Sequence, residues 1–192
     1  MKVKLMADIT VGDIKKITKG KLLCGNEYDI CENFCLDSRE IKSGDVFVGI
    51  KGERVNGNEL YEEVLKKGAK CLILENVEIP EDIIKKYTDS AIIIVEDTIK
   101  ALQQIAEYKR NLYKIPVIAI TGSVGKTSTK DIVAEVVSKK YKVLKTQGNL
   151  NNHIGLPLTI LSLKDEEAMV VELGMSHLGE IITLTKIAKQ TI

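Results

Sequence analysis

The sequence predicts an α/β fold, in which a small mixed α/β N-terminal domain is followed by an incomplete parallel sheet. The first observation is that helical and strand-like segments alternate after residue 58, as they do in α/β proteins. The second is the stretch 115–138, which has the pattern of a buried strand, a glycine-rich loop and a helix. The third is that the apolar runs are short and rich in β-branched residues, which favours buried strands.

The N-terminal elements are expected to be short and of mixed type. A strand is expected at Val3–Met6, and a helix begins near Thr10 and is ended by Gly20. Further short strands are expected between residues 21 and 35, and Val46–Ile50 has the composition of another strand.

Between residues 60 and 112 the pattern becomes regular. Helix, strand, helix, strand and helix are expected in turn at Leu60–Lys67, Lys70–Leu74, Glu81–Tyr87, Ala91–Val95 and from Asp97 or Thr98 to Leu112. Pro116 closely follows the last helix, so a domain boundary is expected near residues 112–115. It divides the chain into residues 1–112 and residues 113–192.

The segment Ile115–Thr129 is the strongest motif of the chain. Gly122 and Gly125 let the backbone fold closely around phosphate oxygens, and the following helix adds the positive end of its dipole. Lys126 can reach the β and γ phosphates of a nucleotide, and the Thr127 hydroxyl can ligate Mg²⁺. The usual loop has about four residues between its first glycine and Gly-Lys. Because this loop is shorter, a plain connecting turn is the alternative interpretation.

The second part of the chain continues the alternation. The helix after the glycine loop is expected to have one apolar face, and an amide-rich polar loop, residues 146–152, is followed by a helix and a strand. The residues of that apolar face are Ile132, Val133, Val136 and Val137. Glu172 stands at the carboxyl end of the strand 168–173, where a second Mg²⁺ contact is expected. A surface carboxylate is the alternative for Glu172, Glu180 is a second metal candidate, and His177 is expected to pack in a loop.

Composition excludes several classes of protein. The net charge of +1 and the aromatic content of 4% argue against a surface for nucleic acid, and no apolar run is long enough to span a bilayer. The N-terminus has no apolar signal-peptide core, so a cytoplasmic protein is expected. Cys24, Cys31, Cys35 and Cys71 form no CxxC pair, and free thiols are expected rather than a zinc site.

Ser38 and Arg39 leave two interpretations open. They can hold an anionic or uridine-bearing ligand, or Arg39 can pair with Asp37 at the surface of a loop that is only a connector. From residue types alone, the surface pair is favoured.

Four stretches together resemble a known family. ITGSVGKTSTKD, TQGNLNNHIGLPLTIL, VVELGMSHLGEI and LDSREIKSGDVFVGIKGERVNG are similar to motifs of the ATP-dependent Mur ligases of peptidoglycan synthesis. The resemblance covers nearly the whole chain, and the short GxxGKT loop is the form that this family uses. It implies that residues 1–112 bind a UDP-sugar-peptide and that residues 113–192 are the first part of a P-loop ATP-binding domain of the Mur ligase central type.

The resemblance also implies a reaction and its residues. ATP phosphorylates the terminal carboxylate of UDP-N-acetylmuramoyl-tripeptide, and the amine of D-alanyl-D-alanine attacks the acyl phosphate. Lys126 is the implied catalytic residue, Thr127 and Glu172 hold Mg²⁺, Asn149 and Asn152 lie near ATP and the peptide, and Ser38 and Arg39 bind the uridine nucleotide. The implied phosphate-binding residues are Gly122, Ser123, Val124, Gly125, Lys126, Thr127 and Ser128.

Two departures from the family pattern leave alternatives open. Asn56-Gly57-Asn58 stands where relatives often have Asp-Gly-His, which puts ligand contacts of that loop in doubt. The family also has further strands and a third domain beyond the segment matched here, so the chain is expected to be the amino-terminal part of such an enzyme or a natural short form. A nucleotide-binding module without turnover and a different P-loop kinase or NTPase are the competing interpretations.

Overall fold

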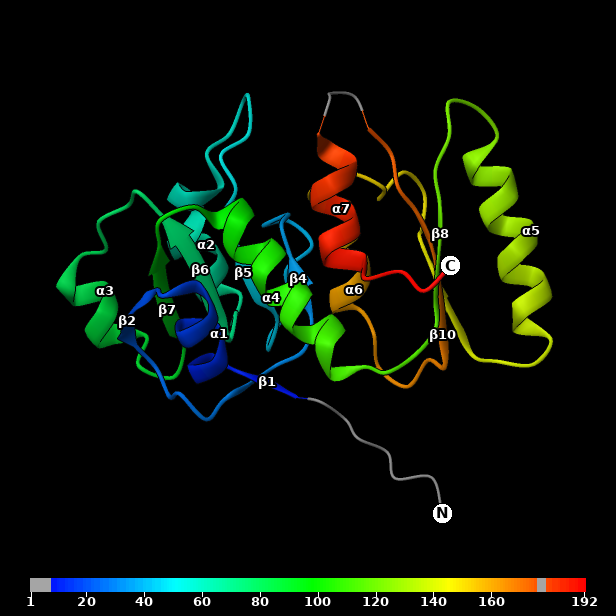
Figure 1. The fold of residues 1–192 in the computed structure, drawn as a ribbon. Coiled ribbons are helices and arrows are strands. Elements are labelled where there is room, and N and C mark those ends of the chain that lie inside the picture. Colours follow the sequence, from blue (N-terminus) through cyan, green and yellow to red (C-terminus); the bar gives the residue numbers. More distant parts are fainter. Residues whose placement is uncertain (1–7, 176–178) are drawn as a thin grey trace, which may run out of the picture. The chain divides into compact units, whose positions relative to one another are not determined.

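The computed structural model describes residues 8–175 and 179–192, so the expectations for Val3–Met6 and His177 lie outside the described residues. Its contacts divide the described chain into two compact units, residues 8–105 and residues 106–192, and each is described by itself. Both are built from helices and strands, so the predicted α/β class is confirmed (Figure 1). The predicted assignment of residues 1–112 and 113–192 to two functions stays a prediction.

The unit of residues 8–105 contains a five-stranded mixed sheet in the order β2-β7-β6-β5-β4. Only β2 runs antiparallel to its neighbour, and a separate antiparallel pair joins β1 to β3. The elements are β1 (Ile9–Thr10), α1 (Val11–Thr18), β2 (Lys21–Cys24), β3 (Ile30–Cys31), β4 (Phe34–Cys35), β5 (Val46–Val48), the 3-10 helix η1 (Gly57–Leu60), α2 (Tyr61–Lys66), β6 (Cys71–Glu75), α3 (Glu81–Lys86) and β7 (Ala91–Val95).

Strand periodicity explains the core of this unit. Successive side chains of a strand point to opposite faces, so Leu72 and Leu74 of β6 share one face of the sheet. Both are fully buried, and they belong to one apolar cluster with Val64 of α2 and Ile83 of α3. Burying a side chain of this size stabilises the fold by about 1.5–3 kcal/mol.

Helix α1 begins as its sequence predicts but ends one residue earlier. Thr10 is the N-cap, and its hydroxyl accepts the N–H of Asp13 while the Asp13 carboxylate accepts the N–H of Thr10. At the other end, Lys19 and not Gly20 takes the left-handed conformation, with φ of 55°. The prediction that Gly20 is the terminator is therefore wrong by one position. Gly20 is needed for space instead, because a Cβ there would lie 2.5 Å from Ile93 Cγ2.

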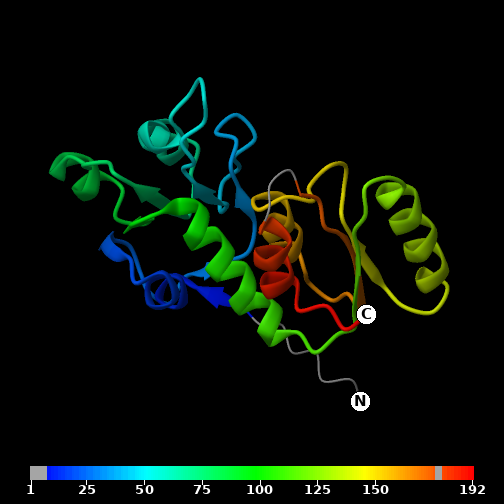
Figure 2. The same ribbon diagram turned by 45° about the horizontal axis from the view of Figure 1, so that its top comes forward.

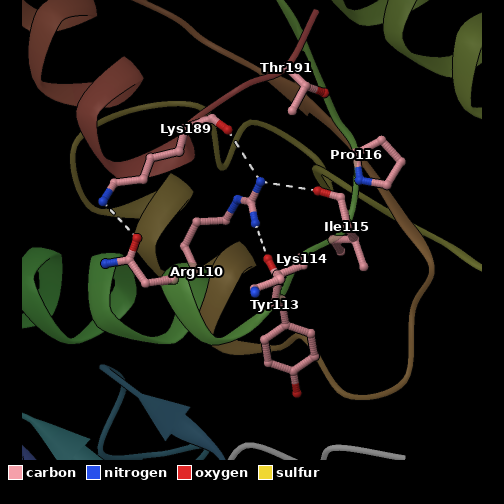
Figure 3. Close-up of a pocket in the computed structure, with 8 residues that line it drawn as sticks. Arg110, Tyr113, Lys114, Ile115, Pro116, Lys189 and Thr191 are labelled. Atoms are coloured by element: carbon pink, nitrogen blue, oxygen red, sulfur yellow. Dashed lines mark hydrogen bonds between the residues drawn. The ribbon is translucent and has the colours of Figure 1, made fainter. Parts of the chain in front are cut away.

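The long helix α4 (Thr98–Leu112) starts in the first unit and ends in the second, as one continuous helix (Figure 2). Its last turn is held within the second unit by a buried arginine. Arg110 donates from Nε to the carbonyl of Ala188 at 2.8 Å and from Nη2 to the carbonyl of Lys189 at 3.2 Å, both at the end of α7 (Glu180–Ala188). Its guanidinium also bonds the carbonyls of Tyr113 and Ile115, which fixes the segment that leads into the next strand (Figure 3).

The unit of residues 106–192 is built on three parallel strands in the order β8-β10-β9. Helix α5 covers one face of this sheet, and α6 and α7 cover the other (Figure 1). The elements are β8 (Val117–Ile120), α5 (Lys126–Ser138), β9 (Val143–Lys145), α6 (Gly155–Leu161), β10 (Ala168–Glu172) and α7 (Glu180–Ala188). β8 and β10 are parallel neighbours, so their carboxyl ends lie at the same edge of the sheet. The glycine loop follows β8 at this edge, and Glu172 ends β10 there.

The buried face of α5 differs from the predicted one. Ile132 and Val136 are 66% and 67% exposed, whereas Lys130 and Ala134 are buried. The prediction that the four apolar residues form the packed face is therefore wrong for two of them. Hydrophobicity alone predicts the wrong face of α5, because one of the residues that this helix buries is a lysine, Lys130.

Among the described residues, no helix is both long and apolar enough to cross a membrane. All four cysteines are free thiols, as the sequence predicted, and Cys31 and Cys71 are buried. In the described ranges, 8–175 and 179–192, no three His, Cys, Asp or Glu side chains form a group that can hold a metal ion.

Candidate nucleotide-binding site

The glycine loop connects β8 to α5 and is exposed throughout residues 121–125. Gly122 and Gly125 have φ of 152° and 75°, values that side-chain-bearing residues rarely adopt. A Cβ on Gly125 would meet nothing within 4 Å, so the space in front of this residue is open. The backbone N–H groups of the first turn of α5 follow directly, so an anion can be bound here by the loop and the helix N-terminus together.

Lys126 is the first residue of α5, and its side chain turns back over the loop. Nζ donates to the carbonyl of Gly122 at 2.8 Å and is partly exposed. This single bond within the loop leaves the ammonium group able to exchange Gly122 for a phosphate oxygen, which is a stronger, charged acceptor.

Thr127 and Glu172, which the sequence proposed as metal ligands, lie in contact. The Thr127 hydroxyl donates to Glu172 Oε2 at 2.8 Å. Glu172 is the last residue of β10 and is only 2% exposed. Because the hydroxyl donates its proton to the carboxylate, its lone pairs stay available to a cation, and oxygen ligands of this kind suit Mg²⁺.

Asn151 is a site residue that the sequence analysis did not single out. Its side-chain Nδ2 donates to the other oxygen of Glu172, Oε1, at 2.7 Å. Its backbone carbonyl accepts the N–H of Gly174 at 2.8 Å. A Cβ on Gly174 would lie 2.9 Å from Asn151 Cγ, so the glycine leaves room for this amide. The amide-rich composition of the loop was the available signal, but it did not show which amide reaches the carboxylate.

The two asparagines proposed from the sequence have other surroundings. Asn149 is exposed, and its carbonyl accepts the N–H of Asn151 at 2.8 Å. Asn152 Oδ1 accepts the N–H groups of Ile154 and Gly155 at 3.1 and 2.8 Å, where α6 begins. The side chain of Asn152 therefore caps a helix in this structure, and its role in substrate binding stays a prediction.

Ser38 and Arg39 belong to the unit of residues 8–105. Ser38 is buried, and its carbonyl accepts Lys67 Nζ at 2.7 Å. The Arg39 guanidinium is highly exposed and pairs with the Asp37 carboxylate, with Nε to Oδ1 at 2.8 Å and Nη2 to Oδ2 at 2.5 Å. This is the surface pair considered from the sequence. An exposed arginine can exchange Asp37 for an anionic ligand, and the role of Ser38 and Arg39 in binding the uridine nucleotide stays a prediction.

The Asp37–Arg39 pair has a measurable signature. Hydrogen bonds from the Arg39 side chain and backbone lower the pKa of Asp37 from 3.8 to about 2. A lowered carboxyl pKa stabilises the fold above pH 3.8, and this contribution is lost as the pH falls toward 2. We expect Arg39→Ala to raise the pKa of Asp37 only part of the way from about 2 toward 3.8, because the backbone N–H of residue 39 still donates to Asp37 Oδ1; NMR titration of the carboxyl carbon measures it. Lys42→Ala, a charge removal three residues away, should leave it near 2, and an unchanged value in Arg39→Ala would contradict the pairing.

The loop that departs from the family pattern is held by its own asparagines. Asn58 is 2% exposed; its Oδ1 accepts the N–H of Glu75 at 2.9 Å, and its Nδ2 donates to Asn56 Oδ1 at 3.0 Å. Asn56 also bonds Glu59. In this chain the Asn58 side chain therefore links the loop to the end of β6.

Two surface hollows lie away from the glycine loop, and the one beside Arg110 has a volume of about 500 Å³ (Figure 3). Two of its cations have partners, because Arg110 bonds backbone carbonyls and Lys189 pairs with Glu107 and Asn111; Lys114 is a third cation in its lining. The other hollow, about 300 Å³, lies at the carboxyl ends of β6 and β7, where Glu75 and Asp97 accept the first N–H groups of α4.

Comparison with known proteins defines the class. Residues 32–110 match the model described as the Mur ligase family, catalytic domain, and residues 120–192 match the Mur ligase middle domain. The chain belongs to the Mur ligase family.

Within that family the chain is similar to UDP-N-acetylmuramoyl-tripeptide–D-alanyl-D-alanine ligase, or MurF. It is 37% identical to the Bacillus subtilis ligase over 182 residues and 35% identical to the Escherichia coli ligase over 185 residues. These alignments cover 93% and 94% of this chain but 38% and 39% of the relatives, so the chain spans about two fifths of their length. The resemblance stated from the sequence motifs is confirmed.

Solved structures give the same family. MurF from Acinetobacter baumannii superposes with a TM-score of 0.83 at 32% identity, covering 98% of this chain and 40% of that one. A MurF ligase from Thermotoga maritima, solved in complex with ADP, gives 0.72 at 39% identity over 82% of this chain and 35% of that chain. The mixed sheet and the parallel sheet thus match the N-terminal and central domains of MurF.

Proposed function

We propose that this chain is the amino-terminal part of an ATP-dependent ligase. That enzyme joins D-alanyl-D-alanine to UDP-N-acetylmuramoyl-tripeptide through an acyl phosphate, in the cytoplasmic synthesis of peptidoglycan precursors. The observation that carries the proposal is the contact between Thr127 and Glu172, 2.8 Å, at the start of the helix that follows the glycine loop. The similarity to MurF along 93% of the chain supports the choice of substrates.

In this proposal residues 1–112 bind the UDP-sugar-peptide, and residues 113–192 bind ATP. Lys126 neutralises the charge that develops on the transferred phosphoryl group, and the loop from Gly122 to Ser128 binds the phosphates through backbone N–H groups. Ser38 and Arg39 bind the uridine nucleotide, and Asn149 and Asn152 lie near ATP and the peptide.

Mg²⁺ is the metal that fits the residues present. Thr127 supplies a neutral hydroxyl and Glu172 a carboxylate, and a Mg²⁺ site on a nucleotide commonly needs only one or two protein ligands besides phosphate and water. The ion would neutralise phosphate charge during transfer. The Asn151 amide keeps the carboxylate oriented toward Thr127, with Nδ2 at 2.7 Å from Oε1.

The alternative is a nucleotide-binding module without ligase turnover. It is supported by the glycine loop alone, whose open space and helix N-terminus can bind phosphate without any ligase chemistry. A different P-loop kinase or NTPase is a weaker alternative, since both units match models of the Mur ligase family.

Calorimetric titration tests the proposal. We expect the chain to bind UDP-N-acetylmuramoyl-tripeptide, because it is 37% identical to a ligase named for that substrate. Arg39→Ala should weaken this binding by roughly tenfold or more, the contribution of one charged hydrogen bond to a diphosphate.

Lys85→Ala is the matched control, because Lys85 is an exposed cation of the same unit paired with Glu81. It should leave the affinity unchanged. Binding of MgATP without any binding of the UDP ligand would reject the ligase substrates and leave the nucleotide-binding module.

A further inference from the structure

Lys130 is an unusual residue for the face it occupies. It lies on α5, one turn after Lys126, and it is only 3% exposed although lysine is a charged residue. Removing an ammonium group from water is unfavourable, and a buried apolar side chain of similar size would usually be at least as stable. A buried lysine here calls for a reason other than stability.

The contacts of Lys130 lead to the end of β9. Nζ donates to the carbonyl of Thr146 at 2.8 Å and pairs with Asp131 Oδ1 at 3.2 Å. Asp131 also pairs with Lys145 Nζ at 2.7 Å, and the Lys145 and Lys130 side chains hold the pKa of Asp131 below its ordinary value. These bonds tie α5 to the point where the chain leaves the sheet.

The ladder of backbone hydrogen bonds between β9 and β10 becomes irregular at Thr146, directly after β9. Its last pair is Lys145 with Val170, and the Thr146 N–H still donates to the Val170 carbonyl at 3.2 Å. In a regular parallel ladder the next bond would join the Glu172 N–H to the Thr146 carbonyl. Here the Glu172 N–H donates to the Thr146 hydroxyl at 3.0 Å, while Lys130 holds the Thr146 carbonyl.

We propose that Lys130 is a positioning residue for Glu172. By taking the Thr146 carbonyl out of the ladder, it turns the chain away from the sheet and presents the Thr146 hydroxyl to the backbone of Glu172. The following loop then returns so that Asn151 reaches the Glu172 carboxylate. The inference rests on the proposed metal role of Glu172 and extends it to a residue that touches neither nucleotide nor metal.

The test measures how strongly Mg²⁺ promotes nucleotide binding. The dissociation constant of ADP is measured by calorimetry, once with EDTA and once with Mg²⁺. The value in EDTA divided by the value in Mg²⁺ is the metal coupling, the factor by which Mg²⁺ strengthens ADP binding. We expect Lys130→Met to reduce this ratio by about tenfold, the size typical of residues that orient metal ligands, with the EDTA value changed less than about twofold. We expect its melting temperature to fall modestly, because methionine fills the buried space but leaves the Thr146 carbonyl without its donor, and thermal unfolding checks that the variant folds.

Two further variants keep the test decisive. Thr146→Val removes the hydroxyl that accepts the Glu172 N–H and should reduce the coupling in the same way. Lys139→Met makes the same change at an exposed position of α5 and should leave it unchanged. The inference is overturned if both Lys130→Met and Thr146→Val keep the wild-type coupling, or if they lose ADP affinity equally with and without Mg²⁺. Either result leaves the proposed metal site itself standing. A wild-type chain that binds ADP without any effect of Mg²⁺ overturns the proposed metal site itself.

Discussion

Lys126→Ala is expected to weaken MgATP binding by about 10- to 100-fold. A charged hydrogen bond contributes about 1.5–3 kcal/mol when its partner is buried or charged, and each 1.4 kcal/mol is tenfold in affinity. The variant should fold normally, because Lys126 Nζ makes a single bond to the carbonyl of Gly122 in its own loop. Calorimetric titration with MgATP measures the affinity, and thermal unfolding checks the fold.

Lys139→Ala is the control for this change. Lys139 lies on the same helix, is exposed and pairs with Glu135 at 2.8 Å, so its loss removes one positive charge from α5 away from the loop. We expect its MgATP affinity to match that of the wild type. Equal affinities in Lys126→Ala and wild type would mean that the loop does not bind the phosphates.

Gly155→Ala is expected to lower the stability of the second unit and to disturb the loop above it. A Cβ at residue 155 would lie 2.4 Å from Leu150 Cα and 2.6 Å from its carbonyl carbon. Both atoms belong to the backbone, so no side-chain rotation relieves the overlap. We expect a loss of about 1–3 kcal/mol in the free energy of unfolding, as in other overpacked sites, and weaker MgATP binding because the loop carries Asn151.

Gly148→Ala separates crowding from backbone strain. Gly148 lies in the same loop at φ of 51°, and a Cβ there meets nothing within 4 Å. This variant should lose only about 1 kcal/mol, the strain of a left-handed residue. Denaturant unfolding of both variants gives the comparison, and a smaller loss for Gly155→Ala than for Gly148→Ala would contradict the close contact with Leu150.

Local signals predicted most of the elements. Helix α1 begins next to Thr10 as expected, the apolar run at Ala91–Val95 is β7, and the strand, loop and helix around Gly122 occur in that order. These features depend on residues that are close in the chain, so propensity and periodicity are sufficient. The end of α1 was missed by one residue, because Lys19 adopts a left-handed conformation that favours glycine elsewhere.

The sequence also indicated the two proposed metal ligands, from the glycine loop and from the carboxylate at a strand end. It did not show that Asn151 and not Asn149 meets Glu172, nor that Asn152 caps α6. Neighbouring asparagines in a polar loop have nearly the same local preferences. Which of them reaches a carboxylate depends on the path of the loop between β9 and α6, and contacts with Gly155 and Gly174 fix that path.

By itself the sequence determined the α/β class, the family and the position of the glycine loop, because these follow from composition, periodicity and contiguous motifs. Only the tertiary structure decided that α5 packs through Lys130 and Ala134, with Ile132 and Val136 exposed. The reason is physical: a lysine can be buried when a distant backbone carbonyl, here that of Thr146, accepts its hydrogen bond. Such a partner is sixteen residues away in the chain, and only folding brings the two together.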